Sequence, residues 1–288
     1  DVTHLYEADY LANPEKFEKW GVKAKTGKEL EEQGLIYIEN EGGERYVINK
    51  EDAKPIVRSP EEIRSYQIAH QKTLCLHTRM PRRYTEQYIN EYAKRIVTVN
   101  NKKILFSKRP TFRGRKKWYH LPDFGTSRII LLKSFHETMY QPLSEQPVLC
   151  DQRAYLFYTS LNVEEVWKYL NSTLFLLTME LYSDRLGGGA LDIRVEDYQN
   201  MPVPDLSKIA INFPSKNLLE RKPLPYYEEV KQPDRRELDK AVLRALGFPE
   251  DELDKLVDEL HKAFVWVVED RLIKAGRPME GKEDGEDN

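Results

Sequence analysis

The feature that most constrains the fold is a change of hydrophobic period near residue 160. Before it, apolar residues occur in short runs separated by Gly, Pro, Asp and Ser, at 128–132, 135–140, 147–150 and 154–159. This spacing predicts a small, mostly antiparallel sheet. After it, a helical period predicts one long helix, capped by Asn162 and ended by Gly187. Its apolar face is expected to carry Val163, Val166, Trp167, Leu170, Leu174, Leu177 and Leu181.

Two further amphipathic helices are predicted near the C-terminus, on either side of Gly247. Their stripes are Leu238, Ala241, Val242, Ala245 and Leu246 in the first, and Leu253, Leu256, Val257, Leu260, Phe264 and Val267 in the second, which runs to about Ala275. Pairing the two face to face as a helical hairpin buries both stripes. The predicted fold class is therefore α+β: a small, mostly antiparallel sheet region with packed helices, followed by a C-terminal helical hairpin.

The N-terminal part of the chain carries weaker signals. The runs 35–38 and 45–48 flank a Gly-containing turn and predict a β-hairpin. Ser59-Pro60-Glu61-Glu62 has the pattern of a helix start and predicts a helix to about Ile68. Residues 73–77 and 85–95 are expected to form a buried strand and a helix. We expect five segments: a lead-in with hairpin and helix (1–72), an α+β domain (73–206), a linker (207–232), the helical hairpin (233–276) and a disordered acidic tail (277–288).

The stretch from Asn101 to His120 is strongly basic. It holds eight Lys and Arg residues and no carboxylate. From Arg79 to His120 there are thirteen Lys and Arg against two Glu, a net charge of +11 within a chain whose formal net charge is −3, so the remaining residues carry −14. Pro110 and Gly114 predict that the stretch forms a bent loop or hairpin instead of a helix.

Two interpretations of this basic stretch follow from the residues alone. Lys and Arg neutralise phosphates, and aromatic faces stack on bases, so the mixture suits a nucleic acid. The aromatic residues set among the cations are Phe106, Phe112, Trp118 and Tyr119. Cation runs are more often simply solvated surface, and in that interpretation the aromatic residues anchor a basic loop to the core.

Several chemistries lack their motifs. Cys75 and Cys150 are far apart, and the six His residues show no metal-type clustering. The run Gly187-Gly188-Gly189 follows a helix and lacks the Lys-Ser/Thr pair of a phosphate loop, so it is expected to be a helix stop and hinge. We assign no catalytic residue, no metal ligand and no cofactor-binding residue. The few cysteines indicate a reducing, cytosolic setting, and no apolar run approaches the roughly 20 residues of a membrane span.

Ordered motifs make the chain similar to the C-terminal target-recognition region of adenine-amino DNA methyltransferases of restriction-modification and phage-defence systems. Lys116-Lys117-Trp118-Tyr119-His120-Leu121 resembles the family's basic-Trp-Tyr strand, and Tyr169-Leu170-Asn171-Ser172-Thr173 its Leu-Asn-Ser helix. Leu186 to Leu191, followed by Met201-Pro202-Val203-Pro204, resembles its Gly-Gly-Gly-Ala segment and Leu-Pro-x-Pro stop. Residues 234–239 and Leu246-Gly247 resemble the helical tail of long members.

This resemblance implies sequence-specific recognition of double-stranded DNA. The methyl-donor turn and the Asn/Asp-Pro-Pro-aromatic motif of such enzymes are missing, and no Pro-Pro pair occurs in the chain. We therefore expect a non-catalytic recognition half. S-adenosylmethionine would bind to a catalytic methyltransferase domain in the same polypeptide or in a partner subunit, in the cytoplasm of a prokaryote.

The expected DNA-binding residues fall into three groups. Lys102, Lys103, Lys108, Lys116 and Lys117 are expected to anchor phosphates, and Arg109, Arg113 and Arg115 to read base edges, because a guanidinium donates two hydrogen bonds to guanine. Further candidates are Thr111, Trp118, Tyr119, Arg185, Gly187, Gly188 and Gly189. Trp118 and Tyr119 are expected to alternate sides on a strand, with one of them in the core. At least one of the three glycines is expected to form a turn with positive φ.

Two other functions fit the same residues. A module that binds single-stranded nucleic acid or RNA would use the aromatic rings as stacking platforms. A scaffold subunit of a defence complex would use the basic loop to meet an acidic protein.

Overall fold

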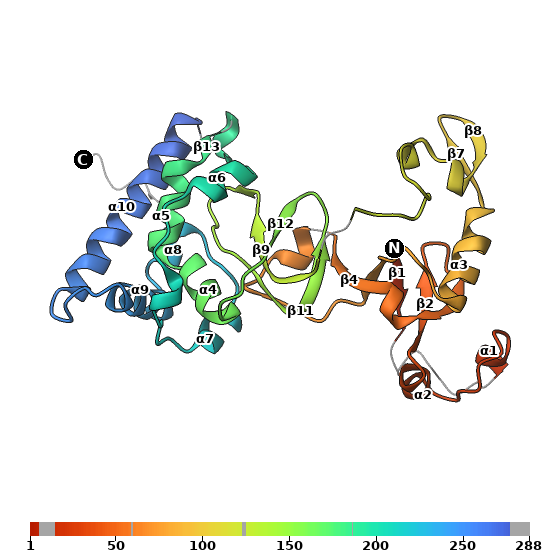
Figure 1. Cartoon of the computed structure of the whole chain (residues 1–288). Coiled ribbons are helices and arrows are strands. Elements are labelled where there is room, and N and C mark those ends of the chain that lie inside the picture. Colours follow the sequence, from red (N-terminus) through yellow and green to blue (C-terminus); the bar gives the residue numbers. More distant parts are fainter. Residues whose placement is uncertain (6–14, 59, 123–124, 186, 277–288) are drawn as a thin grey trace, which may run out of the picture. The chain divides into compact units, whose positions relative to one another are not determined.

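A computed structural model describes residues 1–5, 15–58, 60–122, 125–185 and 187–276, and it divides the chain into two compact units (Figure 1). Unit 1 comprises residues 1–57, 70–126 and 147–149. Unit 2 comprises 58–69, 127–146 and 150–288. Residues 58–69 group with unit 2, in which Tyr66 donates a hydrogen bond to Glu229 (2.8 Å).

Unit 1 is built on antiparallel strands in the order β4-β6-β1-β2-β3. Their bounds are β1 Val2–His4, β2 Leu35–Asn40, β3 Arg45–Asn49, β4 Ala53–Val57 and β6 Thr73–Leu76. The helices of this unit are α1 Glu15–Glu18, α2 Gly27–Glu32 and α3 Arg83–Ala93. Strand β1, which the sequence did not predict, pairs with both β2 and β6, so the start of the lead-in is an interior strand of this sheet.

Unit 2 combines two small sheets with a layer of helices. Strands β12, β9 and β11 pair in that order, β5 adds to β11 in parallel, and β10-β14-β13 form the second sheet. The strands are β5 Gln67–Ile68, β9 Ser127–Leu132, β10 Ser134–Phe135, β11 Leu143–Cys150, β12 Ala154–Phe157, β13 Asp184–Arg185 and β14 Leu191–Asp192. The helices are α4 Val163–Leu170, α5 Thr173–Tyr182, α6 Val195–Asn200, α7 Ser215–Leu219, α8 Tyr226–Glu229, α9 Pro233–Ala245 and α10 Leu253–Lys274.

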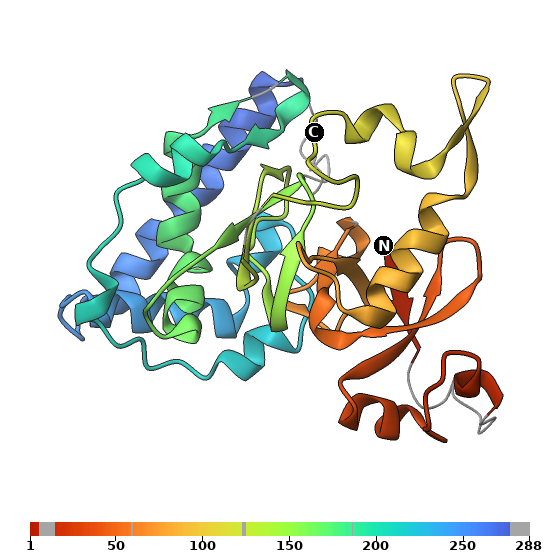
Figure 2. The ribbon, with the colours of Figure 1, turned by 45° about the vertical axis from the view of Figure 1, so that its right-hand side comes forward.

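The α+β class, the 35–48 hairpin, the helix near 85–95 and the two C-terminal helices are confirmed. Helix α10 packs on α9, as expected for a hairpin, and also along α5, as both ribbon views show (Figures 1 and 2). The predicted helix at 60–68 is wrong: a short 3-10 turn, Pro60–Ile63, is followed by β5. Ser59 lies outside the described residues. The predicted linker contains α7 and α8, and the expected disordered tail, residues 277–288, lies outside the described residues.

The predicted long helix is two helices, because polar contacts break it at Asn171 and Ser172. Asn162 caps α4 as expected, accepting hydrogen bonds from the amides of Glu164 and Glu165. Asn171 leaves the helix to bond both backbone groups of Gln141 (2.9 Å each), and Ser172 caps α5. Helix α5 therefore turns a new face inward, made by Phe175, Leu176 and Met179.

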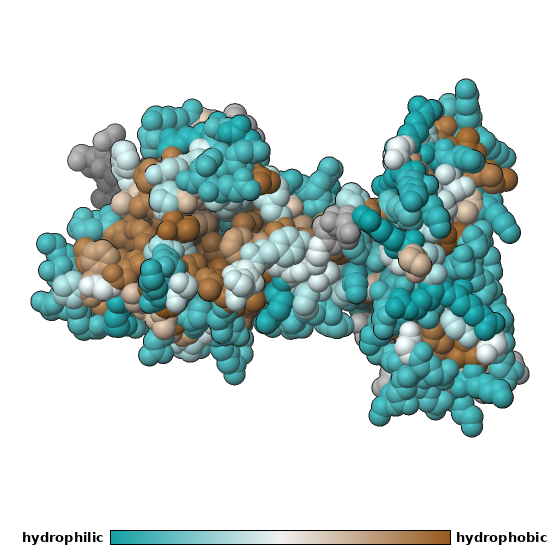
Figure 3. Space-filling model, viewed as in Figure 1, coloured by the Kyte–Doolittle hydropathy of each residue, from teal (hydrophilic) through white to brown (hydrophobic). Residues whose placement is uncertain are grey.

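The break leaves the expected leucine stripe on the outside of α5. Leu174 and Leu177 are half-buried, and the Leu181 side chain is 62% exposed. Hydrophobic residues reach the surface over this part of unit 2 (Figure 3). In the described part of the chain, no helix combines the length and hydropathy needed to cross a bilayer.

A buried ion pair joins distant parts of unit 2. Arg235, fully buried, donates from Nη2 to the Glu229 carboxylate (2.7 Å) and to the Tyr66 hydroxyl (2.7 Å), and from Nη1 to the carbonyl of Asn171. Arg221 adds two further hydrogen bonds to Glu229. Burial alone would raise the pKa of the Glu229 carboxyl, but the two guanidinium groups outweigh burial and lower that pKa to about 2.

We predict that Glu229→Gln destabilises unit 2 by about 3–5 kcal/mol at neutral pH, because Arg235 is left buried without its counter-charge. The folded-state pKa lies below the ordinary value of 4.5, so this stability is present above about pH 4.5 and is lost as the pH falls toward 2. The difference between the two proteins should therefore shrink on acidification. Urea unfolding across this pH range measures it. The exposed neighbour Glu228→Gln should cost less than about 0.5 kcal/mol, and an equal loss in both variants would contradict the prediction.

Candidate nucleic-acid interface

The basic stretch begins in a two-stranded hairpin of unit 1. Strands β7 (Ile96–Val99) and β8 (Lys102–Leu105) pair with Val99 opposite Lys102. The two residues between them, Asn100 and Asn101, have φ of 48° and 59°. Positive φ at both central positions is typical of the tight hairpin turn whose twist matches the strands, and Asn tolerates it. The hairpin carries Lys102 and Lys103 on its second strand.

Two 3-10 turns follow the hairpin, Phe106–Lys108 and Pro110–Phe112. Gly114 then takes a left-handed conformation with φ of 86°. The prediction of a bent loop or hairpin is confirmed. The predicted strand at Trp118 and Tyr119 is wrong, because both residues lie in a turn after Gly114. The two side chains do not alternate between core and surface. Both are half-buried and pack against the core beside the unit 1 sheet.

The aromatic residues of the stretch pack against one another. The ring of Phe106 lies 5.4 Å from Trp118, 5.5 Å from Phe112 and 4.6 Å from Tyr92 of α3, measured between centroids. Trp118 and Tyr119 continue this contact at 5.7 Å. The rings therefore form an aromatic cluster, defined here as Tyr92, Phe106, Phe112, Trp118 and Tyr119, which joins the basic stretch to the core of unit 1. The anchoring role from the second interpretation of the sequence holds for these rings.

The cations around this cluster are mostly exposed and lack ion-pair partners in the described part of the chain. None of the eight makes an ion pair with a described residue, and seven of them are exposed; Arg109 is half-buried. Other cations of unit 1 contrast with them. Arg45, Lys50, Arg82 and Arg95 each have a carboxylate oxygen within 2.9 Å. The positive charge of the basic stretch is therefore not neutralised by ion pairs with the described residues. Those eight residues are Lys102, Lys103, Lys108, Arg109, Arg113, Arg115, Lys116 and Lys117.

The three arginines of the stretch differ in their surroundings. Arg109 lies over the rings of Phe106 (5.3 Å) and Phe112 (5.8 Å). Arg115 lies over Phe112 (5.1 Å) and donates to the carbonyl of Trp118 (3.2 Å). Arg113 is exposed between them and makes no such contact with a described residue. A guanidinium that stacks on a ring is held in place with its edge still available, whereas Arg113 is free to reorient.

Lys117 of the stretch and one further cation, Lys94, complete this surface. A hydrogen bond from Lys117 to the Tyr119 hydroxyl is the main cause that raises the pKa of the Lys117 ammonium, so this charge is secure. Lys94, the exposed residue that directly follows α3, has no ion pair among the described residues and was not predicted from the sequence. It lies within residues 79–120, whose net charge is +11, but outside the denser run of cations after Asn101. Thr111 is exposed in the second 3-10 turn, as its assignment requires.

The other candidates lie in unit 2 and are held by α10. Arg185 forms an ion pair with Asp270 (3.0 Å). Gly188 and Gly189 have φ of 79° and 76°, which confirms a turn with positive φ. This turn connects β13 to β14, and the Gly189 carbonyl accepts a hydrogen bond from Arg271, which is buried against Glu180 (2.8 Å). These contacts give the glycine run a structural role within unit 2.

The other motif residues meet in the interior of unit 2. Thr173 donates from its amide and its hydroxyl to Asp239 (2.7 and 2.6 Å), and Asp239 also pairs with His261 (2.7 Å). Asn171 accepts from Arg235, as described above. The Leu-Asn-Ser segment and the 234–239 segment are therefore bonded to each other. Their side chains hold the unit together and leave the basic stretch of unit 1 as the candidate interface.

Comparison with known proteins identifies the family. Residues 40–238 match the family described as the C-terminal domain of the type II methyltransferase M.Eco57I, which is more than half of the chain. The chain belongs to this family. The residues that match this family run from the end of β2 into α9 and include parts of both units. The resemblance drawn from the motifs is confirmed. A comparison with curated proteins returned no match.

One solved structure shares the fold of this member of the M.Eco57I C-terminal family. It is the crystal structure of the type IIG restriction endonuclease BpuSI, with a TM-score of 0.56 and 15% sequence identity. The alignment covers 80% of this chain and 27% of that chain. The chain thus spans about a quarter of the length of that enzyme.

We predict that Phe106→Ala loosens residues 102–119 without unfolding unit 1. Phe106 is half-buried at the centre of the aromatic cluster, so the loss should be about 2 kcal/mol, below the roughly 3–5 kcal/mol of a fully buried Phe. Amide hydrogen exchange should rise in β8 and the two 3-10 turns and stay unchanged in β2. Thr111→Ala, in the same stretch but exposed, serves as the control. Unchanged exchange in the Phe106 variant would mean that the cluster does not anchor the stretch.

Proposed function

We propose that this chain is the duplex-DNA target-recognition part of a restriction-modification adenine methyltransferase. The observation that carries the proposal is the basic stretch of unit 1, whose eight cations form no ion pair with a described residue and surround the aromatic cluster. A dense, mostly exposed set of cations in a stretch that holds no carboxylate suits an external polyanion. Membership in the M.Eco57I C-terminal family makes DNA the appropriate polyanion.

In this proposal the lysines supply affinity for DNA and the arginines supply specificity for its base sequence. Lys102, Lys103, Lys108, Lys116 and Lys117 neutralise phosphates and release counterions. Arg113 is the leading candidate for a guanine edge, because no described side chain occupies its guanidinium, while Arg109 and Arg115 present their edges from fixed positions over Phe112. Arg185 and the glycine run are left with the structural role that their contacts in unit 2 support.

The arrangement of the rings favours duplex over single-stranded nucleic acid. A stacking platform needs an open ring face. Here the rings face one another and the guanidinium groups of Arg109 and Arg115, so a splayed base finds few free faces. For the scaffold function, in which an acidic protein would meet the same cations, no contact of the described residues gives specific support.

The proposal includes a catalytic partner. Adenine inside a duplex hides its amino group from a methyl donor, so the base must be flipped out, and a second lobe must hold the duplex while this happens. The S-adenosylmethionine-binding catalytic domain would lie in the same polypeptide or in another subunit, in the prokaryotic cytoplasm. This chain alone would not transfer a methyl group.

We predict that replacing Arg115, Lys116 and Lys117 together by Ala weakens binding to every duplex and flattens the salt dependence by roughly one to three phosphate equivalents. Fluorescence anisotropy over a series of salt concentrations measures the slope. The matched control removes three exposed lysines that already have acidic partners, Lys208, Lys216 and Lys262. It carries the same change of net charge and should alter the slope by less than one equivalent. Equal slopes in the two variants would remove the basic stretch from the interface.

We predict that Arg113→Lys relaxes the preference at one base pair by about 1–3 kcal/mol and leaves the salt dependence unchanged, because Lys keeps the charge and loses the two-pronged donor. Competition among duplexes that differ at single positions measures the preference. Lys116→Arg is the control, since it changes the head group at a site assigned to phosphate. Unchanged preference in Arg113→Lys, and also in the matching Arg109 and Arg115 variants, would place base recognition elsewhere.

A further inference from the structure

Unit 2 contains a basic cleft of about 880 Å³ that the function proposed above does not use. Its described lining carries four Lys and Arg side chains and one carboxylate, Glu137. The four cations are Arg64, Lys133, Arg153 and Lys222, and we call this surface the unit 2 cleft. Its floor is apolar, made in part by Phe135 and Tyr140.

The register of the sheet places two of these cations side by side. Leu132 of β9 is paired with Ala154 of β12, so Lys133 and Arg153 are the next residues at the same end of the pair. The Lys133 ammonium lies 4.4 Å from the Tyr155 ring centroid and donates to the carbonyl of Gln152. Arg153 approaches a carboxylate only loosely, at 3.8 Å from Asp151. Lys133 is therefore oriented by neutral groups and has no ion pair with a described residue.

The other two cations come from loops that are pinned to the same sheet region. Arg64 follows Ile63, whose carbonyl accepts a hydrogen bond from the buried Tyr140 hydroxyl. Lys222 precedes the segment in which Tyr226 donates to the carbonyl of Glu137 (2.8 Å) and Pro225 bridges to Thr138. The Lys222 side chain is exposed and has no ion pair with a described residue. Segments of unit 2 that are far apart in the sequence thus place cationic side chains in the lining of one cleft.

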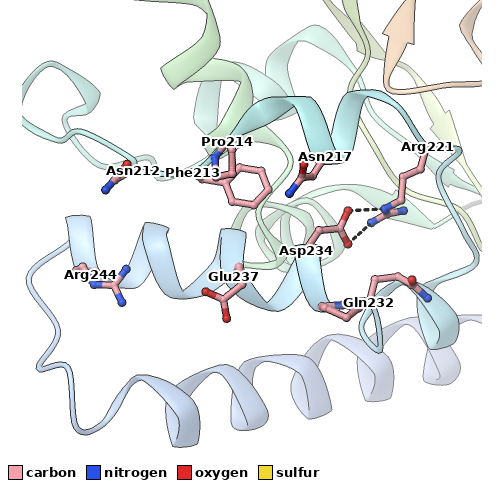
Figure 4. Close-up of a pocket in the computed structure, with 10 residues that line it drawn as sticks. Asn212, Phe213, Pro214, Asn217, Arg221, Gln232, Asp234, Glu237 and Arg244 are labelled. Carbon is pink, nitrogen blue, oxygen red and sulfur yellow. Dashed lines mark hydrogen bonds and ion pairs between the residues drawn. The ribbon is translucent and has the colours of Figure 1, made fainter.

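A second cavity of the same unit shows the opposite arrangement. It measures about 550 Å³ and is lined by Arg221, Asp234, Glu237 and Arg244, among others (Figure 4). Arg221 there bonds to Asp234 (2.6 Å), and Arg244 bonds to Glu250 (2.7 Å). These arginines are neutralised by the fold itself. The excess of positive charge in the unit 2 cleft is therefore a local property and not a general feature of the helical unit.

We infer that the unit 2 cleft is a second phosphate-binding surface, which receives the backbone of the nucleic acid whose recognition we propose for unit 1. The inference rests on that proposed function. Phosphodiester oxygens suit Lys133 and Lys222, which have no ion pair with a described residue, and Arg153, whose contact with Asp151 is long at 3.8 Å. Ammonium and guanidinium groups are strong donors to phosphate. The cleft also gives unit 2 a contact that Arg185 and the glycine run do not offer, since those residues are engaged by α10.

The test is Arg153→Ala with Lys222→Ala, which leaves Lys133 and its structural hydrogen bond in place. Measured on the full chain, duplex binding should lose roughly one to two phosphate equivalents of salt dependence. The matched control, Lys208→Ala with Lys216→Ala, removes two acid-paired lysines of the same unit and should leave the slope unchanged. Restoring charge with Arg153→Lys and Lys222→Arg should restore the slope.

A second measurement does not depend on a mutated fold. Duplex DNA should protect Lys222 from an amine-reactive reagent and leave Lys208 and Lys216 reactive. Inorganic phosphate at the same phosphate concentration distinguishes a site for free anions, which would protect Lys222 equally well, from a backbone contact. Equal protection by inorganic phosphate, or no protection of Lys222 by DNA, overturns the inference.

The two proposals fail in different ways. If the variant of Arg115, Lys116 and Lys117 flattens the salt dependence and the cleft variant does not, the cleft inference is wrong and the proposed function stands. If neither variant changes the slope, both are wrong. If the cleft variant alone changes it, the cleft binds the duplex and the basic stretch of unit 1 does not.

Discussion

Unit 2 depends on one buried guanidinium. Arg235 from α9 bonds to Glu229 of α8, to Tyr66 beside β5 and to the carbonyl at the break between α4 and α5. Each partner comes from a different part of the chain, so the polar groups of Arg235 are all hydrogen-bonded only when these segments come together. A buried charge is tolerated only when it is paired and fully hydrogen-bonded, and this requirement fixes where the four segments meet. The leucines and aromatic residues around the pair fill the space that it defines.

Predictions from the sequence succeeded where local signals were sufficient and failed where distant residues determine the structure. Helices α9 and α10 and the hairpin β2–β3 carry complete local signals, a 3.6-residue stripe or a Gly turn between apolar runs, and they formed as predicted. The long helix after Asn162 failed because its break is set by Gln141 and Asp239, which are about 30 and 66 residues away from their partners. Hydrophobic periodicity depends only on residues that are close together in the sequence. The same limit concealed β1, whose short run gains its place from strands β2 and β6.

The candidate interface was predictable in its charge and unpredictable in its use of aromatic rings. A cluster of cations without carboxylates can be read from the sequence, and no described acid forms an ion pair with it. Whether Phe106 and Trp118 face solvent or one another depends on Tyr92 of α3 and on the turn at Gly114, neither of which the spacing of the rings reveals. The ion pair of Arg185 could not be predicted for a similar reason, because its partner Asp270 lies 85 residues further along the chain.

The cations of both basic surfaces repel one another in the folded chain. Cations held close together repel one another, and the folded state bears this cost when no acid compensates it. In unit 1 the aromatic cluster holds the backbone of the basic stretch while the side chains stay in water, where the repulsion is screened. In unit 2 the cations stand at the ends of paired strands and on pinned loops. A polyanion that neutralised these charges would bind the folded chain more tightly than the unfolded one and would stabilise it. The uncompensated charge is thus a stability cost in the free chain and a source of affinity in the complex.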